Sequence, residues 1–248
     1  METTGALVTR LNAQAAGQSA LERLQALRAA LPGSVVFTTS FGIEDQAITH
    51  LIATAGLDIG FATLDTGRMF PQTYDVWAQT QARYGVKVQA FLPQASAVEA
   101  LVAAQGINGF YDSVEARKVC CEARKLEPLG RALAGAQGWV TGLRADQSDH
   151  RQALSFVSFD EARGLVKLNP IFDWTRADAV AFTKANNVPV NALHAQGFLS
   201  IGCAPCTRAI AEGEPERAGR WWWEDEAQKE CGLHVGPDGS LSRAGAPA

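Results

Sequence analysis

Short apolar runs alternate with helix-like segments through the first part of the chain. The apolar runs lie at 35–37, 59–64, 86–92 and 139–141, and helical patterns occupy 19–30, 47–55, 71–84 and 96–105. A parallel strand cannot follow its neighbour through a tight turn, so it needs a crossover connection, which is usually a helix. The alternation therefore predicts an α/β fold, a parallel sheet with helices on both faces.

Two local patterns extend this prediction. Residues 155–159 and 165–168 are apolar runs separated by a short polar turn, which predicts a β-hairpin. Thr175 and Asp178 have the spacing of a capping box, which predicts a helix that starts there and continues to Asn186.

Length and composition narrow the class of protein. The chain has 248 residues and a formal net charge of -4, which argues against a general nucleic-acid binder. We predict one domain over residues 1–235 and a disordered tail over 236–248, because that tail is rich in Gly, Pro and small polar residues. The first residues do not resemble a secretion signal, and no apolar stretch approaches the ~20 residues of a membrane span, so a cytoplasmic location is expected.

A hydroxyl-rich turn follows the first predicted strand and leads into a helix. Its residues are Thr38-Thr39-Ser40-Phe41-Gly42-Ile43-Glu44-Asp45. Backbone N–H groups at such a helix start can bind a phosphate or a sulfate. The turn has neither the spaced glycines of a dinucleotide fold nor the Gly-Lys-Ser/Thr of an ATP-binding loop. An ordinary Ser or Thr helix cap is the alternative interpretation.

Two more loops follow predicted strands and should lie at the same edge of the sheet. One is Leu64-Asp65-Thr66-Gly67-Arg68, and the other runs from Gly142 to Arg151. The second loop contains Arg144 and Arg151, whose guanidinium groups suit bidentate binding of phosphate or sulfate oxygens. Either arginine could instead form a surface ion pair.

Four of the five cysteines form two pairs. Cys120 and Cys121 are adjacent in a charged helical pattern, and Cys203 and Cys206 form a C-x-x-C pair. Adjacent helical residues point about 100° apart, which suits a single zinc ion poorly. A four-iron cluster takes one thiolate per iron, so we expect a [4Fe-4S] cluster and keep structural zinc as the alternative. Basic residues beside the tandem pair would offset the negative charge of the cluster: Lys118, Arg124 and Lys125.

The fifth cysteine, Cys231, stands alone near the C-terminus. It could be inert, because the acidic run at 224–226 would raise its pKa. As a nucleophile it would need activation by His234, or by arginines and a bound substrate.

Six segments together closely resemble the phosphoadenylylsulfate reductase family, in particular its assimilatory adenylylsulfate reductases. They are SFGIEDQ, LDTGRMFPQTY, the CC…CxxC tetrad, TGLRADQSDHR, ERAGRWWWE and ECGLH. The resemblance implies an adenine nucleotide α-hydrolase-like fold, the substrate adenosine 5′-phosphosulfate, and reduced thioredoxin or a similar dithiol protein as partner. It implies that Cys231 is the nucleophile and that an S-sulfocysteine forms before sulfite is released.

The resemblance also implies the remaining site residues. Cys120, Cys121, Cys203 and Cys206 match the ligands of the cluster. The turn from Ser40 to Asp45, including Phe41 and Gly42, matches the phosphate-binding turn, and residues 64–67 match the nucleotide contacts, with Gly142 in the third loop. The residues around the phosphosulfate would be Lys125, Arg144, Arg151, Arg217, Arg220 and His234.

Three questions stay open at this point. A reductase of 3′-phosphoadenylylsulfate, or one that uses both nucleotides, is the nearest alternative, and a zinc-containing nucleotide-binding sulfur-carrier or regulatory module is a remote one. The Trp221-Trp222-Trp223 run could pack inside the fold or contact a partner. A homo-oligomer is compatible with the sequence.

Overall fold

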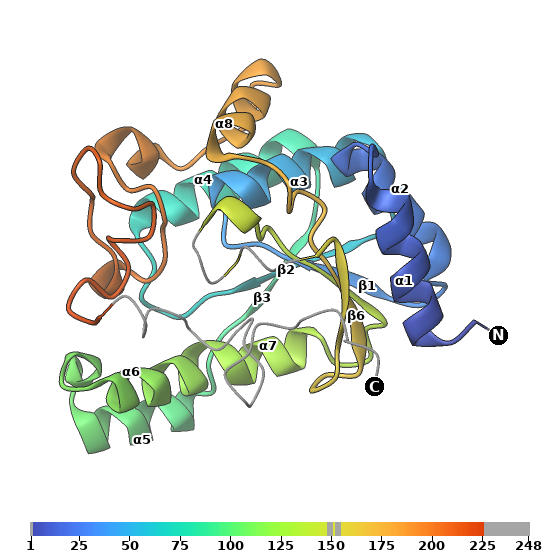
Figure 1. Ribbon diagram of the computed structural model, residues 1–248. Coiled ribbons are helices and arrows are strands. Elements are labelled where there is room, and N and C mark those ends of the chain that lie inside the picture. The colour runs from blue at the N-terminus through green and yellow to red at the C-terminus, as the bar shows by residue number, and fades with distance from the viewer. Residues whose placement is uncertain (1, 148–150, 152–154, 226–248) are drawn as a thin grey trace.

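A single mixed sheet lies at the centre of the described structure, a computed structural model that describes residues 2–147, 151 and 155–225 (Figure 1). The strand order is β3-β2-β1-β4-β6-β5, and β5 alone runs antiparallel to its neighbour. The strands are β1 Val35–Thr38, β2 Gly60–Leu64, β3 Val88–Phe91, β4 Gly138–Val140, β5 Val157–Asp160 and β6 Leu165–Leu168.

Helices cover both faces of this sheet. Figure 1 shows α1, α2, α3, α4 and α8 on one side of the strands and α5, α6 and α7 on the other. Their bounds are α1 Thr4–Ala15, α2 Ala20–Ala30, α3 Ile43–Thr54, α4 Pro71–Tyr84, α5 Ala95–Gln105, α6 Val114–Cys121, α7 Glu127–Ala132 and α8 Arg176–Ala185. Short 3₁₀ turns lie at Gly109–Tyr111, Ala145–Gln147, Ala192–Gln196 and Ala204–Cys206.

The predicted α/β class, the hairpin and the capping box are confirmed. β5 pairs with β6 as an antiparallel hairpin. The Thr175 side chain accepts a hydrogen bond from the Asp178 amide, and the Asp178 side chain accepts one in return from the Thr175 amide. The helix that follows ends one residue before the predicted Asn186, which is its C-cap.

Helix α1 is an element that the sequence analysis did not predict. Its buried residues, Leu7, Leu11 and Ala15, recur every four positions and so form one apolar face. Asn12 fixes this helix to the edge strand, because its side chain donates to the Val157 carbonyl and accepts from the Val157 amide.

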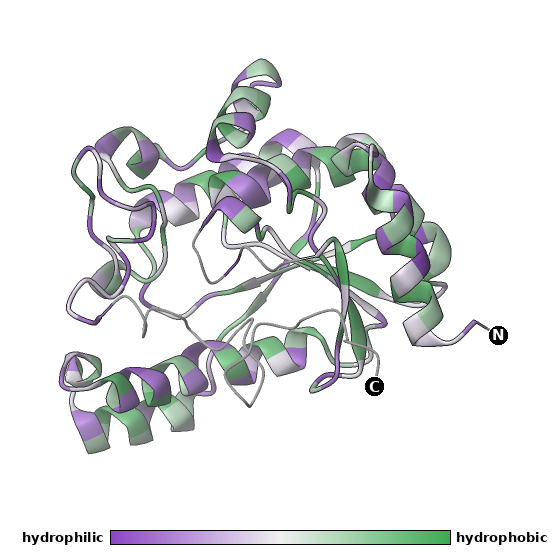
Figure 2. Cartoon of the chain, viewed as in Figure 1, coloured by the Kyte–Doolittle hydropathy of each residue, from purple (hydrophilic) through white to green (hydrophobic). Residues whose placement is uncertain are grey.

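The main core lies between the N-terminal helices and the sheet. It includes Leu24, Leu27, Phe37 and Ile48, all with no exposed surface. Figure 2 shows hydrophobic residues, in green, in the strands and on these helices, where they alternate with hydrophilic ones. The core makes the sheet a rigid support for the loops at its carboxyl edge.

The charged helical segment around the tandem cysteines folds as α6 and α7, which are joined by a π-helical turn. Between α6 and α7, residues Glu122–Leu126 form a π-helix, in which the Glu127 amide donates to the Glu122 carbonyl. Pro128 has no N–H, and its ring would clash with a carbonyl four residues earlier in a regular α-helix. The wider π-turn is a known way to accommodate such a break, and it sets the direction of Arg124 and Lys125.

Within the described ranges, the helices are all too short or too polar to cross a membrane.

Candidate active site

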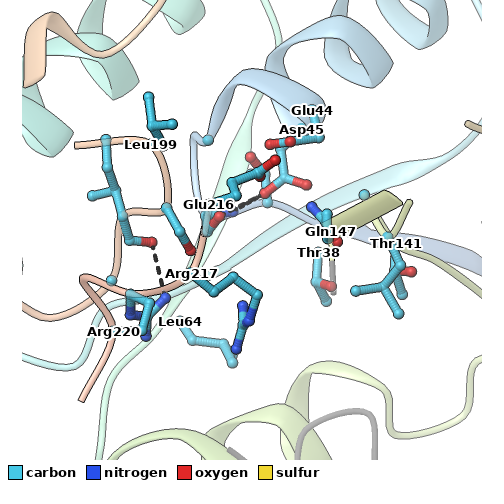
Figure 3. A pocket seen from close by; sticks show the side chains of 18 of the residues that line it. Thr38, Glu44, Asp45, Leu64, Thr141, Gln147, Leu199, Glu216, Arg217 and Arg220 are labelled. Carbon is cyan, nitrogen blue, oxygen red and sulfur yellow. Dashed lines mark hydrogen bonds between the residues drawn. The ribbon is translucent and has the colours of Figure 1, made fainter. Parts of the chain in front are cut away.

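A pocket opens at the carboxyl edge of the parallel strands. One wall comes from the ends of β1, β2 and β4, and the opposite wall from residues 194–221 (Figure 3). Of the residues predicted for the site, those that line it are Ser40, Gly42, Asp45, Leu64, Lys125, Gly142, Arg151, Arg217 and Arg220. The structure therefore brings together loops that are up to 180 residues apart in the sequence.

The turn after β1 has the backbone that the anion-binding interpretation needs. The N-cap of α3 is Gly42, and no side chain caps that helix, so the alternative of an ordinary Ser or Thr cap is wrong. Phe41 does not line the pocket. It is fully buried with φ of +60°, and its ring stacks on Trp77 at a centroid distance of 5.4 Å. Strained backbone of this kind persists only where the surrounding packing fixes it.

Asp45 closes the turn from inside. Its carboxylate accepts hydrogen bonds from the Ser40 amide at 2.6 Å and the Ser40 hydroxyl at 2.7 Å. Gly142 lies directly against it, since a Cβ at Gly142 would come within 2.2 Å of Asp45 Oδ1. Burial raises the pKa of Asp45 to about 7, against the opposing effect of the Ser40 hydrogen bonds.

The raised pKa of Asp45 predicts a pH-dependent stability difference. The folded state keeps a proton on Asp45 that the unfolded state releases between about pH 4 and pH 7, so this residue lowers stability as pH rises through that window, by up to ~1.4 kcal/mol per pH unit. Asp45→Asn removes the ionisation and keeps an oxygen for Ser40. The melting temperature of the variant minus that of the wild type should therefore increase from pH 5 to pH 7. The increase should be ~2–4 °C for each kcal/mol of stability that the wild type loses over this range. A difference in melting temperature that is flat over this range would contradict the prediction.

Arg144 lies behind the pocket wall rather than in it. Its guanidinium is fully buried and donates to Glu44 at 2.9 Å and to both oxygens of Glu216 at 2.8 Å. Asp146 adds a further ion pair at 3.2 Å. Because three carboxylates surround it, Arg144 in this structure supports the loop after β4 and does not face the pocket.

The other predicted cations do face the pocket. Lys125, Arg151, Arg217 and Arg220 all contribute to its lining, and Figure 3 shows Arg217 and Arg220 on the wall opposite the strand ends. Arg151 donates to the Gln147 side chain at 2.5 Å. Arg220 donates to the Ile201 carbonyl at 3.4 Å, and its buried Nε has no hydrogen-bond partner among the residues that the structure describes. An acceptor on a bound anion would satisfy that nitrogen.

The Arg220 guanidinium occupies space that is open because Gly202 has no side chain. A Cβ at Gly202 would come within 2.3 Å of an Arg220 guanidinium nitrogen. We expect Gly202→Ala to push the guanidinium aside and to weaken the binding of inorganic sulfate, measured by calorimetry, by about tenfold, the loss typical of a hydrogen bond to a charged group. Gly130→Ala is the control, because a Cβ there meets nothing within 4 Å. Equal affinities of the two variants would show that Arg220 adapts without loss.

The loop after β2 connects the pocket to the cysteines. Thr66 lines a smaller adjoining pocket together with Lys125 and Cys203, and its hydroxyl lies 3.2 Å from Cys203 Sγ. The Thr66 carbonyl accepts from Arg124 at 2.7 Å. Asp65 and Gly67 do not line the pockets. Asp65 instead accepts hydrogen bonds from Tyr74 and from the Gly67 amide, both at 2.9 Å.

The four paired cysteines come together beside this smaller pocket. None of the four forms a disulfide in the described part of the chain, and Cys120, Cys203 and Cys206 line one small cavity between α5, the end of α6 and the 204–206 turn. Cys121 is close enough to Cys206 to raise the pKa of Cys206. Burial and the neighbouring Cys203 raise the pKa of Cys206 to about 12, so a metal centre here would have to displace a proton to bind this sulfur.

Among the described residues, no three His, Cys, Asp or Glu side chains lie close enough together to hold one metal ion. Phe110 and Trp221 pack with Cys206, and Cys120 and Cys203 lie against them. This apolar packing would exclude water from a group that the cysteines hold.

Sequence reasoning gave no individual role to several polar residues of the pocket: Glu44, Gln147, His194 and Glu216. His194 is the most informative of them. Its Nδ1 lies 2.8 Å from the Phe198 carbonyl, and its buried Nε2 has no partner within the described ranges. Burial lowers the pKa of His194, which favours the neutral ring with Nε2 as an acceptor. It lies nine positions before the C-x-x-C pair, in no motif that marks it as a site residue.

Cys231, His234 and the predicted tail 236–248 lie outside the described residues. The last described residues include the tryptophan run. Trp221 is fully buried against the cysteines, whereas Trp222 is 39% exposed. The first tryptophan is therefore packing, and the second lies at the surface.

Comparison with known proteins gives consistent results. Residues 34–209 match the phosphoadenosine phosphosulfate reductase domain. Proteins named adenosine 5′-phosphosulfate reductase from Agrobacterium fabrum and Burkholderia cepacia are 52% and 51% identical, over 91% and 87% of this chain and 86% and 87% of their own length.

Solved structures agree with the sequence matches. A phosphoadenylyl-sulfate reductase from Candida auris, solved as a phosphate complex, superimposes with a TM-score of 0.72 at 26% identity, covering 85% of this chain and 98% of that one. The NMN synthetase of Francisella tularensis shares the fold alone, with a TM-score of 0.51 at 12% identity over 76% of this chain and 73% of that one. The predicted adenine nucleotide α-hydrolase-like fold is confirmed.

Proposed function

Because this chain belongs to the phosphoadenosine phosphosulfate reductase family, we propose that it reduces adenosine 5′-phosphosulfate to sulfite and AMP. The observation that carries the proposal is the pocket itself. A hydroxyl-rich turn and four basic residues, Lys125, Arg151, Arg217 and Arg220, surround a space at the strand ends, directly beside four cysteines.

The proposed reaction has two steps. The Cys231 thiolate attacks the sulfur of the bound phosphosulfate, the S–O bond to AMP breaks, and an S-sulfocysteine remains. A dithiol protein, thioredoxin or one similar to it, then attacks Cys231. Sulfite leaves with the electron pair of the S–S bond, and a mixed disulfide joins the dithiol protein to Cys231. The second thiol of the dithiol protein then breaks this mixed disulfide, which frees Cys231 and oxidises the dithiol to a disulfide. The substrate sulfur gains two electrons and the dithiol supplies them.

The basic residues have a defined task in the first step. A thiolate that approaches a polyanion is repelled unless fixed positive charges offset the charge that develops on the departing phosphate. Lys125 fits this task well. It lines both pockets at the Ser40 turn. Its positive charge opposes the rise in the pKa of Cys206. Lys125 therefore lies between the substrate site and the cysteines.

We further propose that Cys120, Cys121, Cys203 and Cys206 hold a [4Fe-4S] cluster. The separation and burial of these thiols support it. The cluster would supply local structure and charge, because the proposed chemistry needs only thiols for its electrons. The expected location of the enzyme is the cytoplasm, where reduced dithiol proteins are kept.

The decisive experiment is mass spectrometry after mixing with adenosine 5′-phosphosulfate in the absence of reductant. A sulfonate-sized mass increase on the peptide that contains Cys231, removed by reduced thioredoxin, supports the proposal. No adduct, or an adduct on another residue, refutes it. Iron and acid-labile sulfide analysis of the anaerobically purified protein tests the cluster separately, and stoichiometric zinc without iron would favour the carrier or regulatory module.

Reduction of 3′-phosphoadenylylsulfate is the second candidate, favoured by the structural match to the Candida auris enzyme. The relatives that are about half identical carry the name of the adenosine 5′-phosphosulfate enzyme. Comparison of kcat/KM for the two nucleotides distinguishes the candidates. We expect the value for adenosine 5′-phosphosulfate to be the larger.

A further inference from the structure

A buried ion pair outside the pocket joins the tandem-cysteine helix to the segment that precedes Cys231. Arg117, on α6, donates to Glu224 through Nε at 2.9 Å and through Nη2 at 2.7 Å. The two side chains are 1% and 2% exposed. Burying two charges carries a desolvation penalty that an apolar pair of similar size would avoid, so stability alone does not account for the pair.

The pair also fixes the chain next to the pocket. The Arg117 guanidinium lies 4.7 Å from the centre of the Trp221 ring, and the Arg220 guanidinium lies at the same distance from that ring. The Trp221 amide donates to the Cys206 carbonyl at 3.1 Å, and the Glu224 amide donates to the Trp221 carbonyl at 2.8 Å. Trp221 has φ of +41°, which a bulky residue adopts only when its surroundings impose it.

Glu224 is therefore a fixed point from which the chain continues towards the nucleophile. Cys231 follows it by seven residues, so its Cα lies at most about 25 Å away. The pairing also offsets the charge of Glu224, which belongs to the acidic run expected to raise the pKa of Cys231.

We propose that Arg117 and Glu224 are positioning residues for Cys231: the pair holds Glu224, seven residues before the thiol, against the tandem-cysteine helix beside the pocket. This inference rests on the proposed function. Loss of the pair leaves backbone hydrogen bonds and tryptophan packing to hold residues 221–224. A misplaced nucleophile loses far more rate than substrate affinity, so the two measurements separate positioning from binding.

The test is single-turnover sulfonation of Cys231, followed by mass spectrometry, in the variants Arg117→Met, Glu224→Leu and the double variant. The double variant is decisive because it leaves no unpaired buried charge and should fold. Arg117 also interacts with Cys121, so the iron content of each variant is measured and sulfonation rates are compared per iron-loaded enzyme. In the double variant we expect sulfonation at saturating substrate to slow tenfold or more, with the Kd for AMP within about threefold of wild type. Glu214→Gln is the matched control. Its pair with Arg208 lies in the same part of the chain but is partly exposed, and its rate should not change.

Each other result has one meaning. Wild-type protein that forms no adduct on Cys231 refutes the proposed function, whatever the variants do. Wild-type protein that forms the adduct, with a double variant within threefold of its rate, overturns the positioning role. A double variant whose affinity for AMP falls in parallel with its rate also overturns it, since the pair would then only maintain the fold of the pocket.

Discussion

Cys231→Ser protein should bind AMP and retain iron as the wild type does, yet release sulfite at least ~10⁴-fold more slowly. A serine hydroxyl is a far weaker nucleophile than a thiolate near neutral pH. The measurement is sulfite release with reduced thioredoxin, together with the mass of the enzyme after exposure to substrate.

The tetrad cysteines provide the contrasting variant. Cys203→Ser should lower the iron content, because Cys203 packs with Cys120 and Cys206 around one cavity. Cys231→Ser should leave the iron content unchanged. If Cys231→Ser turns over within tenfold of wild type, or if it loses iron while Cys203→Ser does not, the assignment of the two kinds of cysteine is wrong.

The sheet could be predicted from the sequence because its signals are local. Each strand is a short apolar run, and α4 begins at Pro71 and ends at Tyr84, as its pattern and the following Gly85 indicate. Helix α1 was not predicted because small and polar residues separate its buried positions, so that no continuous apolar run marks it and only a four-residue spacing does. The π-turn at 122–126 depends on how Pro128 is accommodated, which the helical pattern does not encode.

The sequence named several residues that line the pocket, but not the side chains that pair with them. Lys125, Arg217 and Arg220 line the pocket, as the resemblance implies, whereas Arg144 is enclosed by Glu44 and Glu216. These carboxylates lie 100 positions before and 72 positions after Arg144. Only the folded chain brings them together, so sequence spacing gave no indication of the network.

This network supports the last prediction, which concerns stability. Arg144→Met should lower the free energy of unfolding by about 3–5 kcal/mol, because it leaves Glu44 buried without its cation and Glu216 with only the longer ion pair to Arg176 at 3.5 Å. The melting temperature would fall by roughly 10 °C. Burial and the charge of Glu44 already raise the pKa of Glu216, so the loss should be smaller at pH 5, where Glu216 can take up a proton, than at pH 8.

Two comparisons show whether the uncompensated charge is the cause. Arg131→Met breaks an ion pair with Glu127 in which both side chains are more than one-third exposed, so it should cost less than about 1 kcal/mol. Adding Glu44→Gln and Glu216→Gln to Arg144→Met should recover most of the lost stability, because no buried charge is then left unpaired. If the triple variant is as unstable as Arg144→Met, the loss comes from packing around the guanidinium, and Arg144 supports the loop after β4 through its shape rather than through its charge.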